Sequence, residues 1–147
     1  DALPISLIEM KARIFRLGQH YSHIAESCHL EGRIHHSETK AVAQIALFIA
    51  QNYMHPIKTM DIAKHVGLHP DYANSIFKKA FGVSLHQHVT NERINHAQRM
   101  LLTTDNPITD IAWSCGFNTI SRFNSAFLKQ NGCTPREYRK SMDKGFF

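Results

Sequence analysis

The chain has 147 residues, 43% of them hydrophobic, which fits one or two small globular domains. No stretch reaches the ~20 consecutive apolar residues of a membrane-spanning helix, so no membrane span is expected. The formal net charge is +5, and residues 39–147 hold thirteen of the seventeen Lys and Arg side chains against seven Asp and Glu. A basic segment of this kind favours a polyanionic partner.

The three cysteines share no spacing typical of a metal site. Their odd number argues against a disulfide framework and is typical of the reducing cytoplasm. Cys115 lies in a short apolar segment and is expected to be a buried small hydrophobe. The first residues include neither an initiating Met nor a basic segment, so we expect no signal peptide and a chain taken from inside a longer protein.

Residues 5–17 repeat apolar side chains with helical spacing as far as Gly18. This stripe is wide for a helix that stands alone, so we expect it to pack on an upstream domain or on a second copy of itself. Residues 18–37 lack periodicity and are expected to form a linker. The linker contains five histidines, but no pair of them lies at helical i, i+4 spacing with a carboxylate partner. No metal site is therefore predicted.

From Ser37 onward the apolar residues again follow a helical period, and turn and capping residues divide the segment into seven helices without a convincing strand. Ser84 with Gln87 predicts a capping box for one long helix, which should reach about Leu102. Thr134 with Glu137 predicts another for the last helix, which should end near Lys140. The helix starts are expected at a capping residue or a first-turn proline, at Ser37, Thr59, Pro70, Ser84, Asn106, Asn118 and Thr134. The expected fold is all-α.

One stretch of this segment, residues 61–82, recurs as residues 110–132 at a period of 49 or 50 residues. The matching groups are Asp61-Ile62-Ala63 with Asp110-Ile111-Ala112, Gly67 with Gly116, Asn74-Ser75 with Asn124-Ser125, and Gly82 with Gly132. A period of this size indicates a repeated supersecondary unit. Each copy is predicted to be a helix, a tight turn at a glycine, and a second helix. This is the plan of a helix-turn-helix, which places its second helix in the DNA major groove.

Several further motifs occur in a fixed order along the chain. They are Arg93-Ile94-x-x-Ala97-x-x-x-Leu101-Leu102, Ile108-x-Asp110-Ile111-Ala112-x-x-x-Gly116-Phe117, Phe123-x-x-x-Phe127 and Gly132-x-Thr134-Pro135-x-x-Tyr138-Arg139. Over residues 40–140 they resemble the signature of the AraC/XylS-type transcription regulators. The resemblance implies two helix-turn-helix subdomains joined by a long connecting helix. It also implies an effector-binding domain upstream.

Residues 1–37 would then be the end of this upstream domain with a linker, and residues 38–147 the tandem DNA-binding domain. Phe48-Ile49-Ala50-x-Asn52-Tyr53 and Arg93-Ile94-Asn95-His96 look closest to sugar regulators of the melibiose type. Arg93 and Asp110 are expected to hold the two halves together as a charge pair.

Helical geometry sorts the side chains of the two recognition helices, because at about 100° per residue one side of each is apolar and the other polar. The outward residues predicted to read bases are Asp71, Asn74, Ser75, Ser121, Asn124 and Ser125. Four flanking cations are predicted to contact phosphates, namely Lys78, Lys79, Arg122 and Lys129. An exposed Asn or Ser is often only solvated, but the recurrence of Asn-Ser in both copies favours DNA contact. Leu128 stands where the family usually has a basic residue, so the second recognition helix is expected to bind phosphate more weakly than the first.

The sequence thus predicts specific binding of double-stranded promoter DNA by the C-terminal part of a bacterial transcription regulator. The expected role is an activator of sugar or other catabolic genes in the cytoplasm, with RNA polymerase as a partner, an effector bound upstream and no cofactor. Residues 5–17 are the candidate element for a homodimer. The alternative is a protein-interaction or dimerisation module without base readout, in which mutations of the basic face leave function intact. An enzyme is not predicted, because nothing orders Cys133, His86 and His88 as a catalytic unit.

Overall fold

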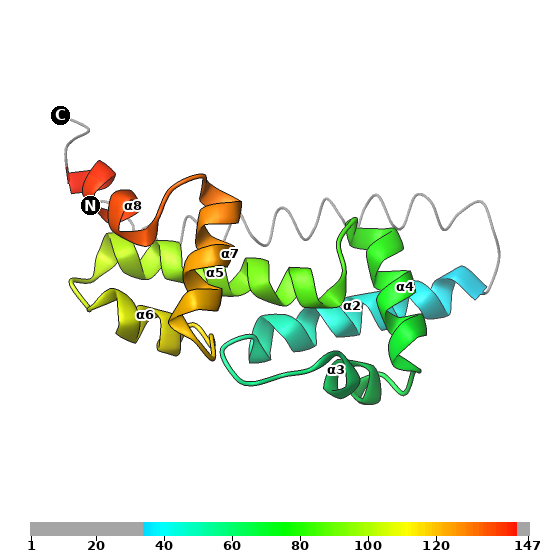
Figure 1. Cartoon of the computed structure of the whole chain (residues 1–147). Coiled ribbons are helices and arrows are strands. Elements are labelled where there is room, and N and C mark those ends of the chain that lie inside the picture. The colour runs from blue at the N-terminus through cyan, green and yellow to red at the C-terminus, as the bar shows by residue number, and fades with distance from the viewer. Residues whose placement is uncertain (1–33, 144–147) are drawn as a thin grey trace, which may run out of the picture.

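The computed structural model describes residues 34–143, which form seven helices and no strand (Figure 1). The helices are α2 (Ile34–Asn52), α3 (Thr59–His65), α4 (Pro70–Phe81), α5 (Leu85–Thr103), α6 (Ile108–Ser114), α7 (Ile120–Asn131) and α8 (Pro135–Asp143). The expected all-α fold is confirmed. The helix predicted over residues 5–17 and most of the predicted linker lie outside the described residues. Within residues 34–143, no helix is both long and apolar enough to cross a bilayer.

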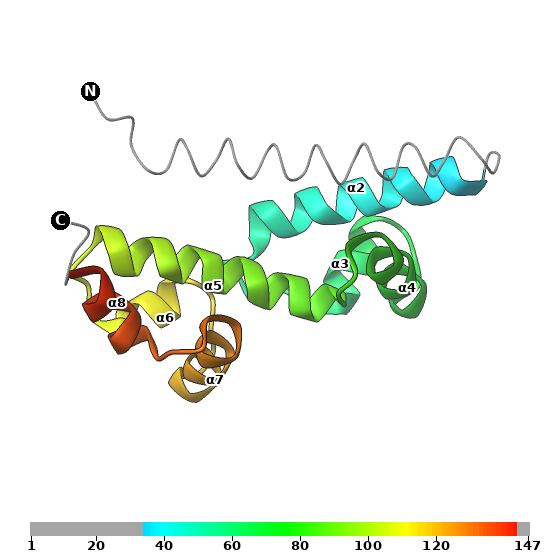
Figure 2. The same ribbon diagram turned by 90° about the horizontal axis from the view of Figure 1, so that it is seen from above.

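The seven helices form two units that share α5, and each unit has its own core. In the first unit, α2, α3, α4 and the start of α5 enclose Ile45, Ile49 and Phe77. In the second unit, the rest of α5 packs with α6, α7 and α8 around Phe123 and Phe127. Viewed from above, α5 runs from one unit to the other (Figure 2). Two helix-turn-helix subdomains joined by a long connecting helix, as predicted, are therefore confirmed, with α3–α4 and α6–α7 as the helix pairs.

Glycine closes both turns as predicted. Gly67 and Gly116 have φ of +69° and +96°, a conformation that glycine adopts more cheaply than residues with a Cβ. The predicted first helical residue Pro70 and the predicted end of this helix at Gly82 are also confirmed. α2 begins at Ile34, three residues before the predicted start at Ser37. Residues 34–37 contain no proline or glycine, so nothing in the sequence prevents the helix from starting before Ser37.

Two helix starts follow the predicted capping pattern in full or in part. At α8 the box is complete, because the Thr134 amide donates to Glu137 Oε2 at 2.7 Å and the Glu137 amide donates to Thr134 Oγ1 at 3.2 Å. The hydrogen bond from the Thr134 amide also lowers the pKa of Glu137. At α5, Ser84 Oγ accepts from the Gln87 amide at 3.1 Å, but the Gln87 side chain donates to Asn91 instead of returning to Ser84.

Three other predicted caps are wrong by one residue, because a sequence pattern places a helix start only to within one or two residues. Lys58, not Thr59, precedes α3, and its amide donates to Asp61 Oδ2 at 2.8 Å. Thr119, not Asn118, caps α7 by accepting from the Arg122 amide at 3.2 Å. Pro107, not Asn106, precedes α6, with no hydrogen bond from a capping side chain.

The two units meet where the end of α2 touches α5 and the turn of the second unit. Arg93 on α5 donates from Nε to the Tyr53 carbonyl at 2.6 Å and from Nη2 to the His55 carbonyl at 2.9 Å. The predicted Arg93–Asp110 charge pair is therefore wrong. Arg93 does bridge the two units, but its partners are backbone oxygens, which a sequence search for opposite charges does not reveal. Burial lowers the pKa of Arg93, although a guanidinium stays charged at neutral pH.

Cys115 belongs to the second core, as predicted, with no exposed surface. Burial raises the pKa of its thiol to about 12, and nearby Arg99 offsets this only in part. Because the thiolate is the reactive form, iodoacetamide at pH 8 should modify the half-buried Cys133 while sparing Cys115 until a denaturant is added. Peptide mass spectrometry of the native and denatured protein measures this. Equal native rates at both cysteines would contradict the packing of α6.

Candidate nucleic-acid interface

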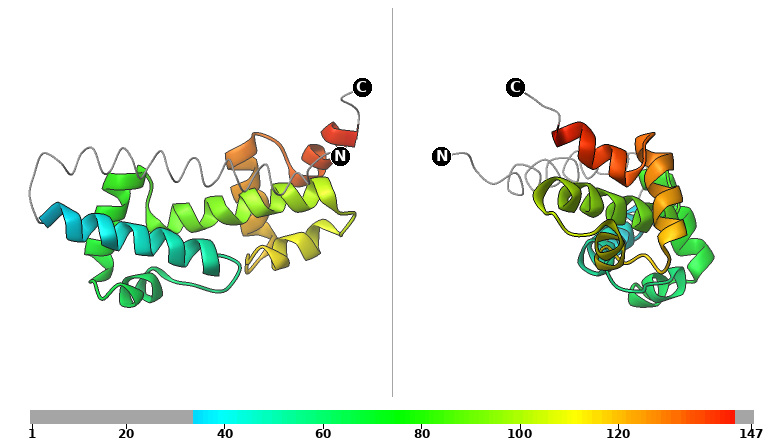
Figure 3. Two further views of the ribbon diagram at one scale, coloured as in Figure 1. Left: turned by 180° about the vertical axis from the view of Figure 1, so that it is seen from behind. Right: turned by 60° about the vertical axis from the view of Figure 1, so that its left-hand side comes forward.

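The second helices of the two helix-turn-helix pairs, α4 and α7, present the same kind of surface to the same side of the molecule. In Figure 1 α7 stands across α5 and α4 stands across α2, beyond the start of α5, and the two helices run in the same direction. Figure 2 shows both helices nearly end-on. The right-hand view of Figure 3 again places them on one side. A single flat or gently curved partner can therefore contact both helices at once.

The outward face of α7 agrees with the helical-wheel prediction. Phe123 and Phe127 have no exposed surface and anchor the helix in the second core. The opposite side is exposed and consists of Ser121, Arg122, Asn124, Ser125, Leu128 and Lys129. The sequence therefore predicted correctly which α7 residues face away from the core.

α4 follows the same plan with one exception. Ala73, Ile76 and Phe77 are buried, and the exposed side carries Asp71, Ser75, Lys78 and Lys79. Tyr72 flanks this side and donates from its hydroxyl to Glu38 Oε1 at 2.6 Å, which fastens α4 to α2 and raises the pKa of Tyr72. Within residues 34–143, none of the four predicted phosphate contacts, Lys78, Lys79, Arg122 and Lys129, is held in an ion pair.

The exception is Asn74, whose predicted outward orientation is wrong. Its Oδ1 accepts the amide of Leu85 at 2.9 Å, so the side chain is half-buried and holds the first turn of α5. The equivalent Asn124 is exposed and has no hydrogen bond to its side chain within residues 34–143. The repeat explains the difference, because Pro135 stands in the second unit where Leu85 stands in the first, and proline has no amide hydrogen to donate. Comparing Leu85 with Pro135 in the sequence would have revealed that only Asn124 lacks this backbone partner.

Alanine at the two asparagines should therefore have unlike effects. Asn74→Ala leaves the buried Leu85 amide without its partner, so we expect a loss of about 1–2 kcal/mol in the free energy of unfolding. Asn124→Ala should leave stability almost unchanged but weaken specific DNA binding by about 1–3 kcal/mol. Urea unfolding and anisotropy titration of both variants measure the two quantities. Equal losses of stability would contradict this assignment.

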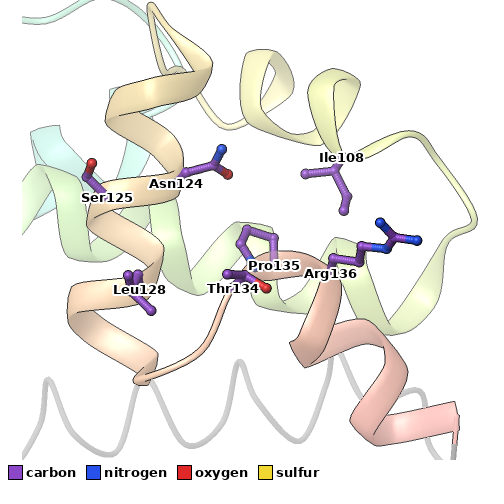
Figure 4. A pocket seen from close by; sticks show the side chains of 7 residues that line it. All are labelled: Ile108, Asn124, Ser125, Leu128, Thr134, Pro135 and Arg136. Carbon is purple, nitrogen blue, oxygen red and sulfur yellow. The ribbon is translucent and has the colours of Figure 1, made fainter.

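A hollow of about 460 Å³ lies beside α7, between that helix and the first turns of α6 and α8. Figure 4 shows Asn124 and Ile108 pointing toward one another across it, with Arg136 at its edge. The other side chains around it are Ser125, Leu128, Thr134 and Pro135. Arg136 is the one charged residue among those that line it. The residues from α6 and α8 were not predicted as part of the site, because only the fold brings them to α7.

Two helix-turn-helix pairs in tandem, each with a polar outward helix flanked by cations, define a DNA-binding class of protein. A helix-turn-helix domain family matches residues 62–141. The melibiose operon regulatory protein of Escherichia coli (strain K12) is 42% identical over 99 residues, which cover 67% of this chain and 33% of that protein.

Solved structures agree. The C-terminal domain of AraT, a response regulator from Geobacillus stearothermophilus, has a TM-score of 0.66 at 27% identity, with 69% of this chain and 84% of that chain covered. A transcriptional regulator with an AraC-type DNA-binding domain from Chromobacterium violaceum has a TM-score of 0.64 at 28% identity, with coverage of 69% and 90%. The chain belongs to the AraC-type helix-turn-helix transcription regulators, as its motifs indicated. It spans between 10% and 40% of the length of the curated relatives it matches, and 33% of the melibiose operon regulatory protein.

Proposed function

We propose that this chain is the DNA-binding part of a transcription activator and that it inserts α4 and α7 into two successive major grooves on one face of promoter DNA. The observation that carries the proposal is that α4 and α7 run in the same direction on one side of the molecule, with their polar faces outward. The 19 residues of α5 span about 28 Å at 1.5 Å per residue. Successive major grooves on one face lie ~34 Å apart, so a slight bend of the DNA, at a cost on the order of 1–6 kcal/mol, accommodates both helices.

Base contacts are proposed for the exposed polar residues Asp71, Ser75, Ser121, Asn124 and Ser125. Asn124 is the strongest of them, because an amide pairs with adenine through its oxygen and its nitrogen together. The oxygen of Asn74 already accepts the Leu85 amide, so we assign Asn74 to the support of α5. Asp71 Oδ2 lies 3.7 Å from Nδ1 of His69, whose side chain is also exposed. The Asp71 carboxylate suits a cytosine amine.

The wider role rests on the relatives. Because one of them is named a melibiose operon regulatory protein, we propose that this chain regulates a sugar or other catabolic operon in the cytoplasm. An effector bound by another part of the protein, a contact with RNA polymerase and a homodimer through residues 5–17 complete this proposal. Residues 1–37 would belong to the upstream domain and linker, although α2 crosses that boundary.

The salt dependence of binding separates DNA recognition from a protein-interaction module. If Lys78, Lys79, Arg122 and Lys129 all contact phosphates, they should together contribute about −3.6 to the slope of log affinity against log salt, at about −0.9 per phosphate. Anisotropy titration of DNA selected from a random pool, over a series of KCl concentrations, measures the slope.

Lys79→Ala should reduce the slope by about 0.9 in magnitude and weaken all sequences alike. Lys40→Ala on α2 is the matched control, because Lys40 is an exposed lysine outside both recognition helices, and it should leave the slope unchanged. A salt slope near zero for the unaltered chain would contradict DNA binding and favour the protein-interaction module.

A further inference from the structure

Leu128 is the one apolar side chain on the outward face of α7. It is 48% exposed, although the residues around it on this face are polar or charged. The equivalent position on α4 is Lys78. A single exposed leucine is common on protein surfaces. Here, however, the leucine stands one helical turn from Asn124, on the same side of the helix, so it neighbours a proposed base contact.

The chemistry of the major groove leaves few partners for such a side chain. The base edges there offer hydrogen-bond donors and acceptors, which leucine cannot use, and one apolar group, the C5-methyl of thymine. Leu128 also cannot bind phosphate as Lys78 can. Leu128 lines the same hollow as the apolar side chains of Ile108 and Pro135 (Figure 4).

We propose that Leu128 reads the C5-methyl of a thymine in the half-element bound by the second unit. The inference rests on the proposed function, because it requires α7 to lie in the major groove. Four residues of helix cover about 6 Å, and base pairs are spaced ~3.4 Å apart. The thymine should therefore lie one or two base pairs from the pair that Asn124 contacts. The half-element of the first unit should have no such thymine requirement, because Lys78 replaces the leucine.

Deoxyuridine provides the test, because it differs from thymidine only by this methyl group. Each thymine of a site selected from random DNA is replaced in turn by uracil, and binding of the full chain is measured by anisotropy. For the unaltered chain we expect roughly fourfold weaker binding at one thymine of the second half-element, which is the value of one buried methyl group. Uracil at the other thymines should change the binding affinity little.

Leu128→Ala should bind the thymine site more weakly by a similar factor and should no longer distinguish thymine from uracil at that position. Leu47→Ala is the matched control, since Leu47 is 59% exposed on α2 and lies outside both recognition helices. This variant should keep the full discrimination. Thermal melting checks that both variants are folded.

Three results would overturn the proposal: a selected site without thymine in the second half-element, no uracil effect, or an effect that persists in Leu128→Ala. A chain that binds no DNA would instead contradict the proposed function itself, so the two failures are distinguishable. Leu128→Lys adds an independent readout. This variant should abolish the thymine–uracil discrimination. It should also steepen the salt dependence of DNA binding, because the new lysine can contact phosphate as Lys78 on α4 is proposed to do.

Discussion

Gly116→Ala is expected to destabilise the protein by about 3–4 kcal/mol, whereas Gly67→Ala, in the equivalent turn, should cost only about 1–2 kcal/mol. Both glycines have positive φ, so both changes strain the backbone. A Cβ at Gly116 would also lie 2.9 Å from the carbonyl oxygens of Tyr53 and Met54 and 3.0 Å from Arg93 Nε. A Cβ at Gly67 meets nothing within 4 Å. The difference between the two variants therefore measures the contact between the units.

Urea unfolding of the two variants and of the unaltered chain gives the comparison. Gly116→Ala should also impair DNA binding that depends on both half-elements, because relieving the overlap moves the second unit away from the end of α2. Gly67→Ala should bind as the unaltered chain does once folded. Equal losses of stability at the two glycines would mean that the second unit does not pack against α2 as described.

DNA with five base pairs inserted between the two half-elements is expected to bind at least about 100-fold more weakly. Five base pairs turn the second half-element to the opposite face of the duplex. It is then out of reach of α7, which lies on the same side of the molecule as α4. Losing the base and phosphate contacts of one unit should cost about 3 kcal/mol of binding free energy, which corresponds to the 100-fold loss of affinity. Insertion of ten base pairs restores the face but adds about 34 Å, which exceeds the span of α5, so affinity should stay low.

Competition mobility shifts with the three DNAs measure this spacing rule. Replacing the intervening base pairs without changing their number is the control, and it should be tolerated because neither recognition helix reaches them. Recovery of full affinity with the ten-base-pair insertion would contradict a fixed arrangement of the two units. It would indicate either a mobile junction or two chains that each use one unit.

The repeat and its periodicity were sufficient to predict the seven helices, the two subdomains and the orientation of α7. This succeeded because buried aromatic residues such as Phe123 and Phe127 recur with helical spacing, and burial of one face determines the other. Cap positions were less predictable, since Asn118 and Thr119 are both good caps and only the local backbone selects one of them.

The residues that the sequence assigned wrongly have partners distant in the chain. Asn74 is bound by an amide eleven positions away, and Arg93 by carbonyls about forty positions away. A backbone amide or carbonyl is present at nearly every position, so the sequence alone does not distinguish it as a partner. The hollow beside α7 was missed for the same reason, since Ile108 and Arg136 reach it only through the fold.

Footprinting tests the central claim, that one chain reads an asymmetric site with both recognition helices. Hydroxyl-radical cleavage of the selected site should be measured with the full chain at a concentration where sedimentation gives one protein per DNA. We predict two protected segments on the same face, about one helical turn apart, with Lys78→Ala weakening protection of one segment and Arg122→Ala that of the other. A single protected segment, or a strict requirement for an inverted repeat filled by two chains, would contradict the account.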